Sequence, residues 1–447
     1  MNHIINSIDY IQLAIAKHEF HKKTPNIQIE LDLSSQTLDV LDKEERKVAI
    51  KNLLHLYRNY ITKLILKLHG DEQFLLEAEF SCQNLKGISV DSNSSQRVYG
   101  SAIHTKEAAE IFEKLLTKYM CQLNMLETRG IWNVYNERMM KCQNNYVPVL
   151  NSLVLNHNLI NMATPFVQFF GEHITSLEFF KIHGDETSGL RGYLPNLKHV
   201  HLTVEYCAPF VIANTNGRNL VSLSFHDEGD GYNSAAAMNS IKTNMPLFPK
   251  LKLLEMNNPK ILKDVLKNSF NTLEYLYVPN QDRDNPWTKI CPTRTLPALK
   301  DLCVEGVKRW SISMIKKNCS TLECLICYGY ISLEEFQERE NALFEEIRGF
   351  DHAMFNLNVS FQSDEYCWSY LTMLNCNFPK MELLMLPGCT NQTLVNILAS
   401  RCPPNVKVIT DKMEVGKVLK ARIKRQYPYP RYADIINKQM AETLGIY

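Results

Sequence analysis

The sequence predicts an α/β fold: a leucine-rich-repeat solenoid, or horseshoe, with a parallel β-sheet on its concave face and helical N- and C-terminal caps. A short pattern, apolar-x-x-apolar-x-apolar, recurs along most of the chain. Most of its spacings fall within the roughly 20–29 residues of leucine-rich repeats. Several of the segments between the copies have the periodicity of amphipathic helices. The 447 residues are 45% hydrophobic, which supplies enough apolar material for such an array.

Each copy of the pattern predicts one short strand with a single buried face. Two apolar residues separated by one residue point to the same side of a strand, and the earlier apolar residue leads into it. One unit cannot bury its apolar face alone, so stacked neighbours form a common core. The clear copies are Ile61-Leu64-Leu66, Leu85-Ile88-Val90, Leu150-Leu153-Leu155, Ile174-Leu177-Phe179, Leu197-Val200-Leu202, Leu220-Leu223-Phe225, Leu251-Leu254-Met256, Leu273-Leu276-Val278, Leu299-Leu302-Val304, Leu322-Leu325-Cys327 and Met381-Leu384-Leu386, and weaker copies begin at Leu123, Met354 and Val406.

The segments between copies are expected to return along the outside of the solenoid as helices. Lys260 to Lys267 and Thr393 to Ala399 each place leucine and isoleucine side chains on one helical side. Thr105 to Met120 is predicted as a longer helix, and Ser332 to Ile347 as a glutamate-rich one. These two helices account for the widest spacings between neighbouring copies.

Three regions are predicted from this pattern. Residues 1–60 are expected to form a helical N-terminal cap, because a solenoid end must cover its exposed core. Residues 61–411 form the leucine-rich-repeat solenoid. Residues 412–447 are expected to form a basic, helical C-terminal cap or tail. That last segment carries six basic residues between Lys412 and Arg425 against one acid, Glu414.

Composition excludes several classes of function. The formal net charge is +1, so there is no global field that would attract nucleic acid or an anionic membrane. No apolar run reaches the roughly 18–20 residues that would span a bilayer. The first residues lack the basic region of a secretory signal. Thirteen cysteines without such a signal predict reduced thiols and a cytoplasmic or nuclear location.

No motif in the sequence predicts an enzyme, a cofactor or a metal site. The glycine-rich phosphate loops, the zinc-protease motif and the nucleophile elbow are absent. Cys324 and Cys327 form a Cys-x-x-Cys, but Cys327 is expected to point into the core and Cys324 away from it. His199 and His201 share one strand face with the spacing of a metal pair, and surface histidines are the favoured interpretation.

The strand phase does predict a partner-binding surface. Residues that alternate with the core positions should face the concavity, where neighbouring strands lie about 4.8 Å apart and make a continuous patch. Tyrosines are frequent at interface hot spots, and neither tyrosine of the patch is expected to belong to the core. The predicted partner-binding residues are His199, His201, His226, Glu255, Tyr275, Tyr277, Asp301, Glu305 and Tyr328. The competing sites are the loop at 227–233 and the glutamate-rich helix at 332–347.

The repeats resemble the cysteine-containing leucine-rich repeats of F-box proteins, the substrate receptors of cullin-based ubiquitin ligases. In the segment from Leu384 to Cys389, a predicted strand is followed by a turn that contains Cys389. The predicted helix after this turn ends at Cys402 and Pro403. Leu38 to Tyr57 is similar to the later half of an F-box, although the opening Leu-Pro motif is missing. The resemblance implies a degenerate F-box within residues 1–60 that would bind Skp1 and cullin, and a plain capping helix explains the same residues.

Taken together, these observations predict a protein–protein recognition subunit rather than an enzyme. The resemblance implies that it recruits substrates to a cullin-type ubiquitin ligase. The alternative is a non-ligase scaffold or inhibitor that binds its partner on the same concave face. Neither interpretation requires nucleic acid, a membrane, a metal or a cofactor.

Overall fold

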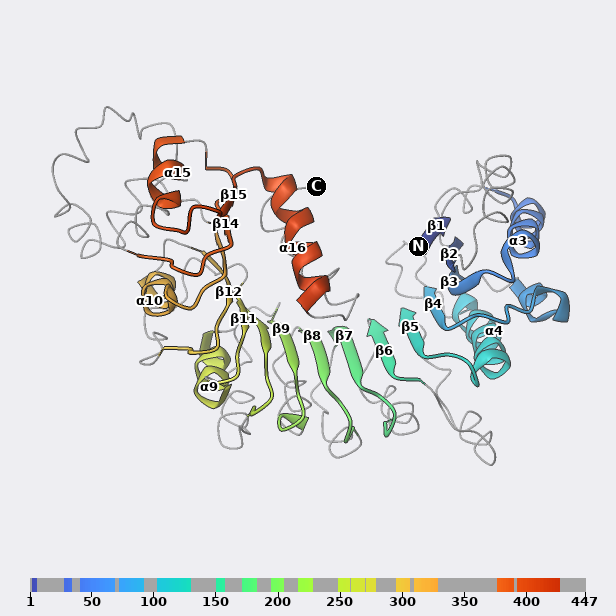
Figure 1. Ribbon diagram of the computed structural model, residues 1–447. Coiled ribbons are helices and arrows are strands. Elements are labelled where there is room, and N and C mark those ends of the chain that lie inside the picture. The colour runs from blue at the N-terminus through green and yellow to red at the C-terminus, as the bar shows by residue number, and fades with distance from the viewer. Residues whose placement is uncertain are drawn as a thin grey trace. The chain divides into compact units, whose positions relative to one another are not determined.

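The computed structural model shows two compact units of parallel strands and helices (Figure 1). Unit 1 comprises Met1–Asn219 and Asp227–Ile241, and unit 2 comprises Leu220–His226 and Lys242–Tyr447. The residues that the structure describes are 2–5, 28–33, 41–68, 72–91, 103–129, 150–156, 171–182, 194–204, 216–227, 248–257, 259–269, 271–278, 295–305, 309–328, 376–389 and 392–426. In each unit the strands follow one another in sequence order, which confirms the predicted α/β repeat solenoid.

Unit 1 is built on a sheet in which each strand pairs in parallel with the next. Its strands are β1 (Asn2–Ile5), β2 (Gln28–Leu33), β3 (Ile61–Lys67), β4 (Gly87–Asp91), β5 (Met125–Arg129), β6 (Ser152–Asn156), β7 (Ser176–Ile182) and β8 (His199–Val204). The register places the repeat leucines opposite one another, as with Leu126 and Leu153, both fully buried. Stacking of identical positions therefore builds the core, as the pattern predicts.

The array begins earlier than the predicted boundary at residue 61. Strands β1 and β2 pair in parallel ahead of β3, so residues 1–60 are not a purely helical cap. The sequence from residue 27 to 33 reads Ile-Gln-Ile-Glu-Leu-Asp-Leu, a plain alternation of apolar and polar residues. This is a strand pattern without the leading apolar position of the repeat, and the repeat motif alone does not identify it.

Helices α3 (Lys43–Tyr57) and α4 (Ile103–Tyr119), with the short 3₁₀ helices η1 (Glu72–Leu76) and η2 (Ala78–Phe80), complete the described part of unit 1. Asp42 starts α3 because its carboxylate accepts hydrogen bonds from the backbone amides of Glu44 and Glu45, both at 2.9 Å. The apolar side of α3 is buried, with Tyr57 fully enclosed. Since α3 connects β2 to β3, it occupies the place of a repeat helix.

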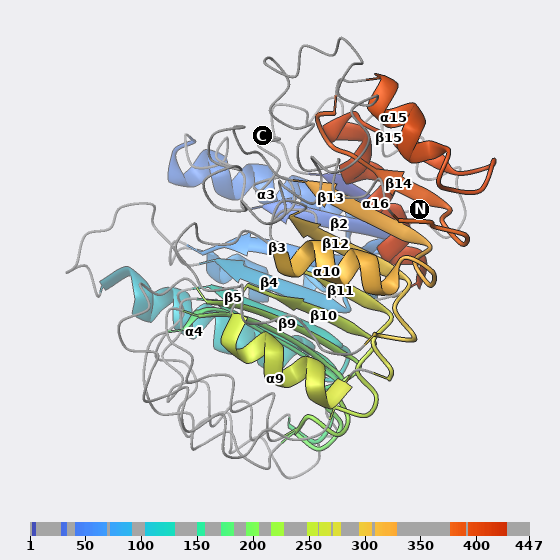
Figure 2. The ribbon, with the colours of Figure 1, turned by 90° about the vertical axis from the view of Figure 1, so that its left-hand side faces the viewer.

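Unit 2 has the same construction. Its strands are β9 (Ser222–Asp227), β10 (Leu253–Met256), β11 (Tyr275–Tyr277), β12 (Asp301–Glu305), β13 (Cys324–Tyr328), β14 (Leu383–Met385) and β15 (Lys407–Ile409). Its helices are α9 (Pro259–Ser269), α10 (Arg309–Asn318), α15 (Gln392–Ala399) and α16 (Lys412–Gln426). Helices α9 and α10 lie on one face of this sheet and α16 lies on the other (Figures 1 and 2).

The repeat core of unit 2 confirms the strand phase that the sequence predicts. Leu223, Leu254, Leu276, Leu302, Leu325 and Leu384 stand opposite one another in register on successive strands. Each of these six side chains is at most 1% exposed. The described helices agree with the predicted ones: α9 and α15 cover the segments at 260–267 and 393–399, and α4 ends one residue before the end of the segment at 105–120. The helix at 332–347, the loop at 228–233 and the weak copy at Met354 lie outside the described residues.

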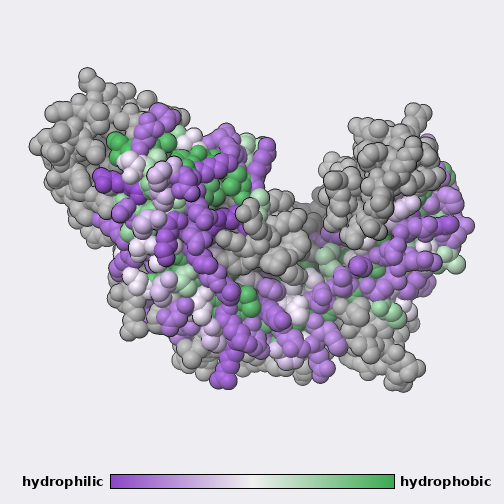
Figure 3. Space-filling model, viewed as in Figure 1, coloured by the Kyte–Doolittle hydropathy of each residue, from purple (hydrophilic) through white to green (hydrophobic). Residues whose placement is uncertain are grey.

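On the side that Figure 3 shows, most of the described surface is hydrophilic. Among the described residues, the large hydrophobic side chains with high exposure are Val48 on α3 and Met413 on α16, at 55% each. None of the helices that the structure describes is long and apolar enough to cross a membrane.

Candidate partner-binding face

The sheet of unit 2 turns a second set of side chains away from the repeat core. We call this surface the unit 2 face. The register aligns its residues in two rows, Ser222, Leu253, Tyr275, Asp301, Cys324 and Leu383 in the first, and Ser224, Glu255, Tyr277, Cys303, Ile326, Met385 and Ile409 in the second. The rows are apolar and aromatic at the centre and contain two acids.

The unit 2 face is buried, not solvent-exposed. Nine of its residues, Tyr275 and Tyr277 among them, form a second hydrophobic cluster together with Val415 of α16. Val418 of α16 packs against the same cluster. The tyrosines are at most 1% exposed, so the expectation that they lie outside the core is wrong. The repeat pattern describes only the repeats, and it contains no information that would place a helix from beyond them on this face.

Helix α16 presents a narrow apolar stripe to the face. Val415, Val418 and Arg422 recur at intervals of three and four residues and therefore share one side of the helix. The seven steps along the helix from Val415 to Arg422 rise about 10.5 Å, which matches roughly two inter-strand spacings. The helix consequently crosses the strands, with Val415 in one cluster with Ile409 of β15 and Arg422 at Asp301 of β12.

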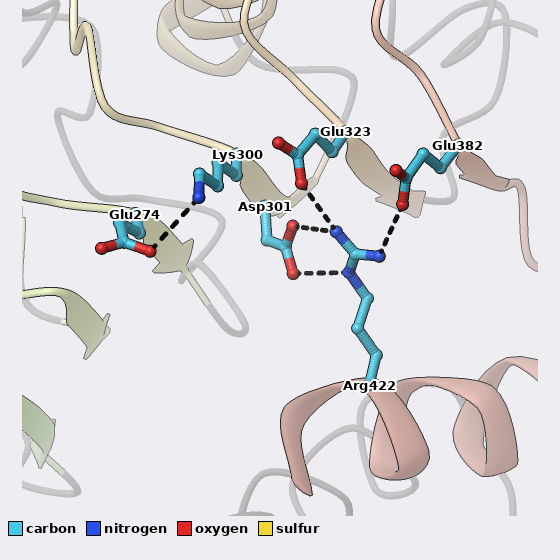
Figure 4. Close-up of polar contacts among 6 residues, drawn as sticks. All are labelled: Glu274, Lys300, Asp301, Glu323, Glu382 and Arg422. Atoms are coloured by element: carbon cyan, nitrogen blue, oxygen red, sulfur yellow. Dashed lines mark hydrogen bonds and ion pairs between the residues drawn. The ribbon is translucent and has the colours of Figure 1, made fainter. Parts of the chain in front are cut away.

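Arg422 ends this stripe in a group of three carboxylates, which we call the Arg422 clamp (Figure 4). Its Nε and Nη2 each donate to an Asp301 carboxylate oxygen at 2.8 Å, a bidentate pair. Its Nη2 also lies 3.5 Å from Glu323 Oε2, and its Nη1 3.4 Å from Glu382 Oε2. The Asp301 side chain is 3% exposed, so the guanidinium neutralises a carboxylate that is almost fully shielded from water. Burial raises the pKa of Asp301, and Arg422 opposes that rise.

A band of charged residues continues the clamp along the edge where the strands begin. Glu274, Lys300, Glu323 and Glu382 each come directly before a strand. Lys252 Nζ lies 2.9 Å from Glu274 Oε1. Lys300 Nζ lies 3.7 Å from Glu274 Oε2, as Figure 4 shows. These side chains are more exposed than Asp301, and their pairs contribute little stability. Their charges do contribute to the electrostatic potential that a partner would meet at this edge.

A buried polar cluster lies at the other end of the unit 2 face. Glu255 of β10 is fully buried, and the Ser224 hydroxyl donates to its Oε2 at 2.7 Å. His226 Nε2 lies 3.1 Å from Glu255 Oε1. The predicted residues His226 and Glu255 are therefore brought together, but as an internal pair between β9 and β10. The Ser224 hydroxyl donates to the carboxylate, whereas the serine of a hydrolytic triad donates to the imidazole.

The predicted residues of unit 1 are also largely enclosed. His201 of β8 is 3% exposed and stands opposite Glu178 of β7. Burial, aided by the neighbouring Lys198, lowers the pKa of His199 from 6.5 to about 4, so its imidazole is neutral at pH 7. Of the remaining predicted residues, Glu305 and Tyr328 are placed as backbone positions of β12 and β13, and their side chains lie outside the description.

The two thiols of the predicted Cys-x-x-Cys point to opposite sides of β13. Cys324 belongs to the unit 2 face, whereas Cys327 lies on the core side of the strand. Burial raises the pKa of Cys324 and of Cys303 well above the ordinary value, which keeps both thiols protonated. The expected phase of this pair is therefore confirmed. Within the described residues, no group of three or more metal-ligating side chains lies together.

Sequence reasoning missed the residue that organises this face. Arg422 lies in the basic segment that was expected to cap the end of the solenoid, and a helix does begin at Lys412. The spacing of Val415, Val418 and Arg422 was the available signal. It identifies one side of a helix, but it does not show which surface that side contacts. The helix crosses the sheet instead of covering its end.

Comparison with known proteins gives little beyond the fold. No protein-family model matches the chain, and no curated protein matches it. Among solved structures, the chain is similar to a chain in the crystal structure of the Rad7 and Elc1 complex in yeast. The two are 12% identical, the alignment covers 92% of this chain and 89% of that chain, and the TM-score is 0.37. The solenoid fold of this chain is established by its own strand order, register and core.

Proposed function

We propose that this chain is a protein-recognition subunit that binds a protein partner through the unit 2 face. The observation that carries the proposal is the binding of α16 itself. A helix is held there by an apolar stripe and a bidentate arginine, so the surface has the chemistry of a helix-binding site. Solenoid strands present this surface continuously, without any support from loops.

The chemistry of the described residues favours recognition over catalysis. The thiols on the face are held protonated by burial, and the Ser224 hydroxyl donates to the Glu255 carboxylate. Tyr275, Tyr277 and Arg422 are instead the residue types that dominate binding energy at protein interfaces. A scaffold or an inhibitor that uses this face is the broad form of the proposal.

Cross-linking tests this proposal directly. Tagged full-length protein is purified from its native cell and treated with a lysine-reactive cross-linker before mass spectrometry. Lys300, Lys407 and Lys417 border the unit 2 face or α16, while Lys86 and Lys198 are exposed lysines of unit 1 and serve as controls. We expect a co-purifying protein to be joined at the first three. Cross-links confined to the two control lysines would move the binding site off unit 2.

Recruitment to a cullin-type ubiquitin ligase is the second, finer proposal. It is supported by the cysteine-containing repeat, in which Cys389 is buried four residues after the end of β14 and Cys402 donates through its thiol to the Leu398 carbonyl near the end of α15. Helix α3 is the region that resembles an F-box, and its apolar side is already buried within unit 1. An adaptor would therefore use the outward side of α3, where Val48 is exposed.

A pull-down distinguishes the two forms of the proposal. If the ligase form is correct, full-length protein retains Skp1 and cullin, and Val48→Glu abolishes that retention without lowering the melting temperature. Glu45→Gln, on the exposed part of the same helix, is the matched control and should leave retention unchanged. Failure of the wild-type chain to retain Skp1 would reject the ligase form and leave the broader recognition proposal in place.

A further inference from the structure

We infer that α16 is an internal ligand of the unit 2 face, and that the external partner is a basic amphipathic helix that replaces it. The partner helix would carry two apolar residues three positions apart and an arginine four positions later, as Val415, Val418 and Arg422 do. This inference rests on the proposed recognition function and names the class of partner. It is carried by four features of α16 and its surroundings.

The first feature is the one-sided attachment of α16. Val415 is fully buried, whereas Met413, Lys417 and Ala421 on the same helix are exposed. An amphipathic helix lying in an apolar groove is a common mode of peptide recognition. The surface under α16 therefore fits any helix of similar pattern, whether it belongs to this chain or to another.

The second feature is the weakness of α16 as an isolated helix. Gly416 lies inside it, and a Cβ at this position would meet nothing within 4 Å. Glycine is therefore not required there by packing, and it disfavours the helix relative to alanine. The valines on the contact stripe are β-branched and also poor helix formers. A helix with these residues depends on its contacts with the face and is suited to leaving it.

The third feature is the anchoring of the chain just before α16. The backbone amide of Leu386 donates to the Ile409 carbonyl at 2.8 Å, and that of Gly388 donates to the Thr410 carbonyl at 2.9 Å. Asp411 then caps α16 by accepting from the Glu414 amide at 2.8 Å. The array is thus secured as far as Thr410, and α16 can leave as a capped unit from the 410–411 link.

The fourth feature is the charge of the surface that α16 covers. Asp301, Glu323 and Glu382 surround one guanidinium, so release of α16 removes the cation that the three acids share and uncovers Asp301, whose side chain is 3% exposed. A partner helix that covers Asp301 again would have to supply a cation at the same place to keep its carboxylate ionised. Arginine makes the bidentate pair and lysine does not, so the partner is expected to require arginine at the clamp.

The thiols of β13 report whether α16 leaves on its own. Cys324 lies under α16 beside the clamp, and Cys327 lies on the core side of the same strand. Opening of α16 exposes Cys324 alone, whereas global unfolding exposes both. The experiment is site-resolved alkylation of the full-length chain by iodoacetamide, followed by mass spectrometry.

Three variants are expected to change the alkylation rate of Cys324, two by raising it and one by lowering it. Arg422→Ala removes the clamp and should speed alkylation of Cys324 at least about tenfold, with Cys327 unchanged. Arg422→Lys keeps the charge but loses the bidentate pair and should give an intermediate rate. Gly416→Ala should slow alkylation of Cys324 about fivefold by stabilising the helix. Equal acceleration of Cys324 and Cys327, or no change at Cys324, would overturn the inference.

A labelled peptide of residues 411–426 tests the partner class. We expect it to bind the full-length Arg422→Ala variant more tightly than wild type, and the Gly416→Ala variant less tightly, in fluorescence anisotropy. The same peptide with lysine in place of Arg422 should bind the Arg422→Ala variant at least about tenfold more weakly. Absence of peptide binding to every variant would reject the inference, while cross-links from a captured protein to unit 2 would still support the recognition function.

Discussion

At the scale of single residues, the position of a side chain relative to the sheet decides its role. Leu254 and Glu255 are neighbours in sequence and both are fully buried, yet they belong to opposite faces of β10. Leu254 packs in the repeat core, whereas Glu255 accepts a hydrogen bond from Ser224 at Oε2 and lies against His226. A carboxylate in place of Leu254 would lie among the apolar side chains of the repeat core, and a leucine in place of Glu255 would leave Ser224 and His226 without their carboxylate partner.

Leu254→Asp tests the repeat core. We expect it to lower the stability of unit 2 by about 4 kcal/mol or more, because an unpaired carboxylate would be enclosed between stacked leucines. Chemical denaturation of wild type and variant, with fluorescence as the readout, measures the difference. Leu254→Met is the matched control, for which a loss below about 1.5 kcal/mol is expected. Similar midpoints for the aspartate variant and wild type would show that the strand phase is wrong.

His199 is expected to make stability depend on pH. Its folded pKa of about 4 lies below the ordinary 6.5, so between these values the unfolded chain takes up a proton that the folded chain does not. Stability from this residue is therefore present above about pH 6.5 and is lost as the pH falls towards 4. The urea midpoint should fall less between pH 7 and pH 5 in His199→Asn than in wild type. Equal falls in the two proteins would contradict the prediction.

At the scale of secondary-structure elements, helix ends and strand edges show how local sequence is used. Asp42 begins α3 through two side-chain hydrogen bonds, and Asp411 begins α16 through one. Both helices carry one apolar side, but α3 packs it within a repeat whereas α16 packs it across several strands. The caps follow from sequence directly, because the bonded amides lie within three residues.

Asp42→Ala is expected to destabilise unit 1 by about 1 kcal/mol, because it leaves the Glu44 and Glu45 amides without their cap. Asp42 is exposed, so lost packing contributes little to this change. Thermal melts followed by circular dichroism measure it. The matched control, Asp42→Asn, keeps an accepting oxygen and should retain most of the stability. An equal loss for both substitutions would mean that the charge, and not the hydrogen bonds, supports α3.

At the scale of the whole molecule, unit 2 has an apolar layer on each side of its sheet. The repeat core lies on one side, and the cluster of the unit 2 face lies on the other, closed by α16. A parallel sheet covered on both faces is typical of α/β proteins. A partner that displaces α16 would exchange one covering helix for another, so the repeat core would remain intact.

The double substitution Tyr275→Ala with Tyr277→Ala is now expected to damage folding. Both rings are enclosed in the second layer, and removing a large buried aromatic side chain costs about 3 kcal/mol or more. Denaturation midpoints measure the loss. Tyr275→Phe with Tyr277→Phe is the matched control, which keeps the ring volume and should lose much less. A double alanine variant with a wild-type midpoint would show that the layer does not support unit 2.

The sequence by itself determined the repeat architecture, the phase of the strands and most of the described helices. Those features depend on neighbours a few residues apart, and periodicity records them: Leu276 is buried in the repeat core because its own strand pattern requires it. The same alternation correctly assigned Tyr275, Tyr277, Glu255 and Asp301 to one common face. It also separated Cys324 from Cys327.

Only the tertiary structure decided whether that face is open or covered. Arg422 and Asp301 are 121 residues apart, and no local pattern joins them. The strands β1 and β2 likewise gain their place only by pairing with β3, since their alternation lacks the full repeat motif. Contacts of this kind depend on which surfaces meet after the chain has folded. The alternation in a strand's sequence therefore predicts which residues share each face of the sheet, but it does not predict which element will cover the second face.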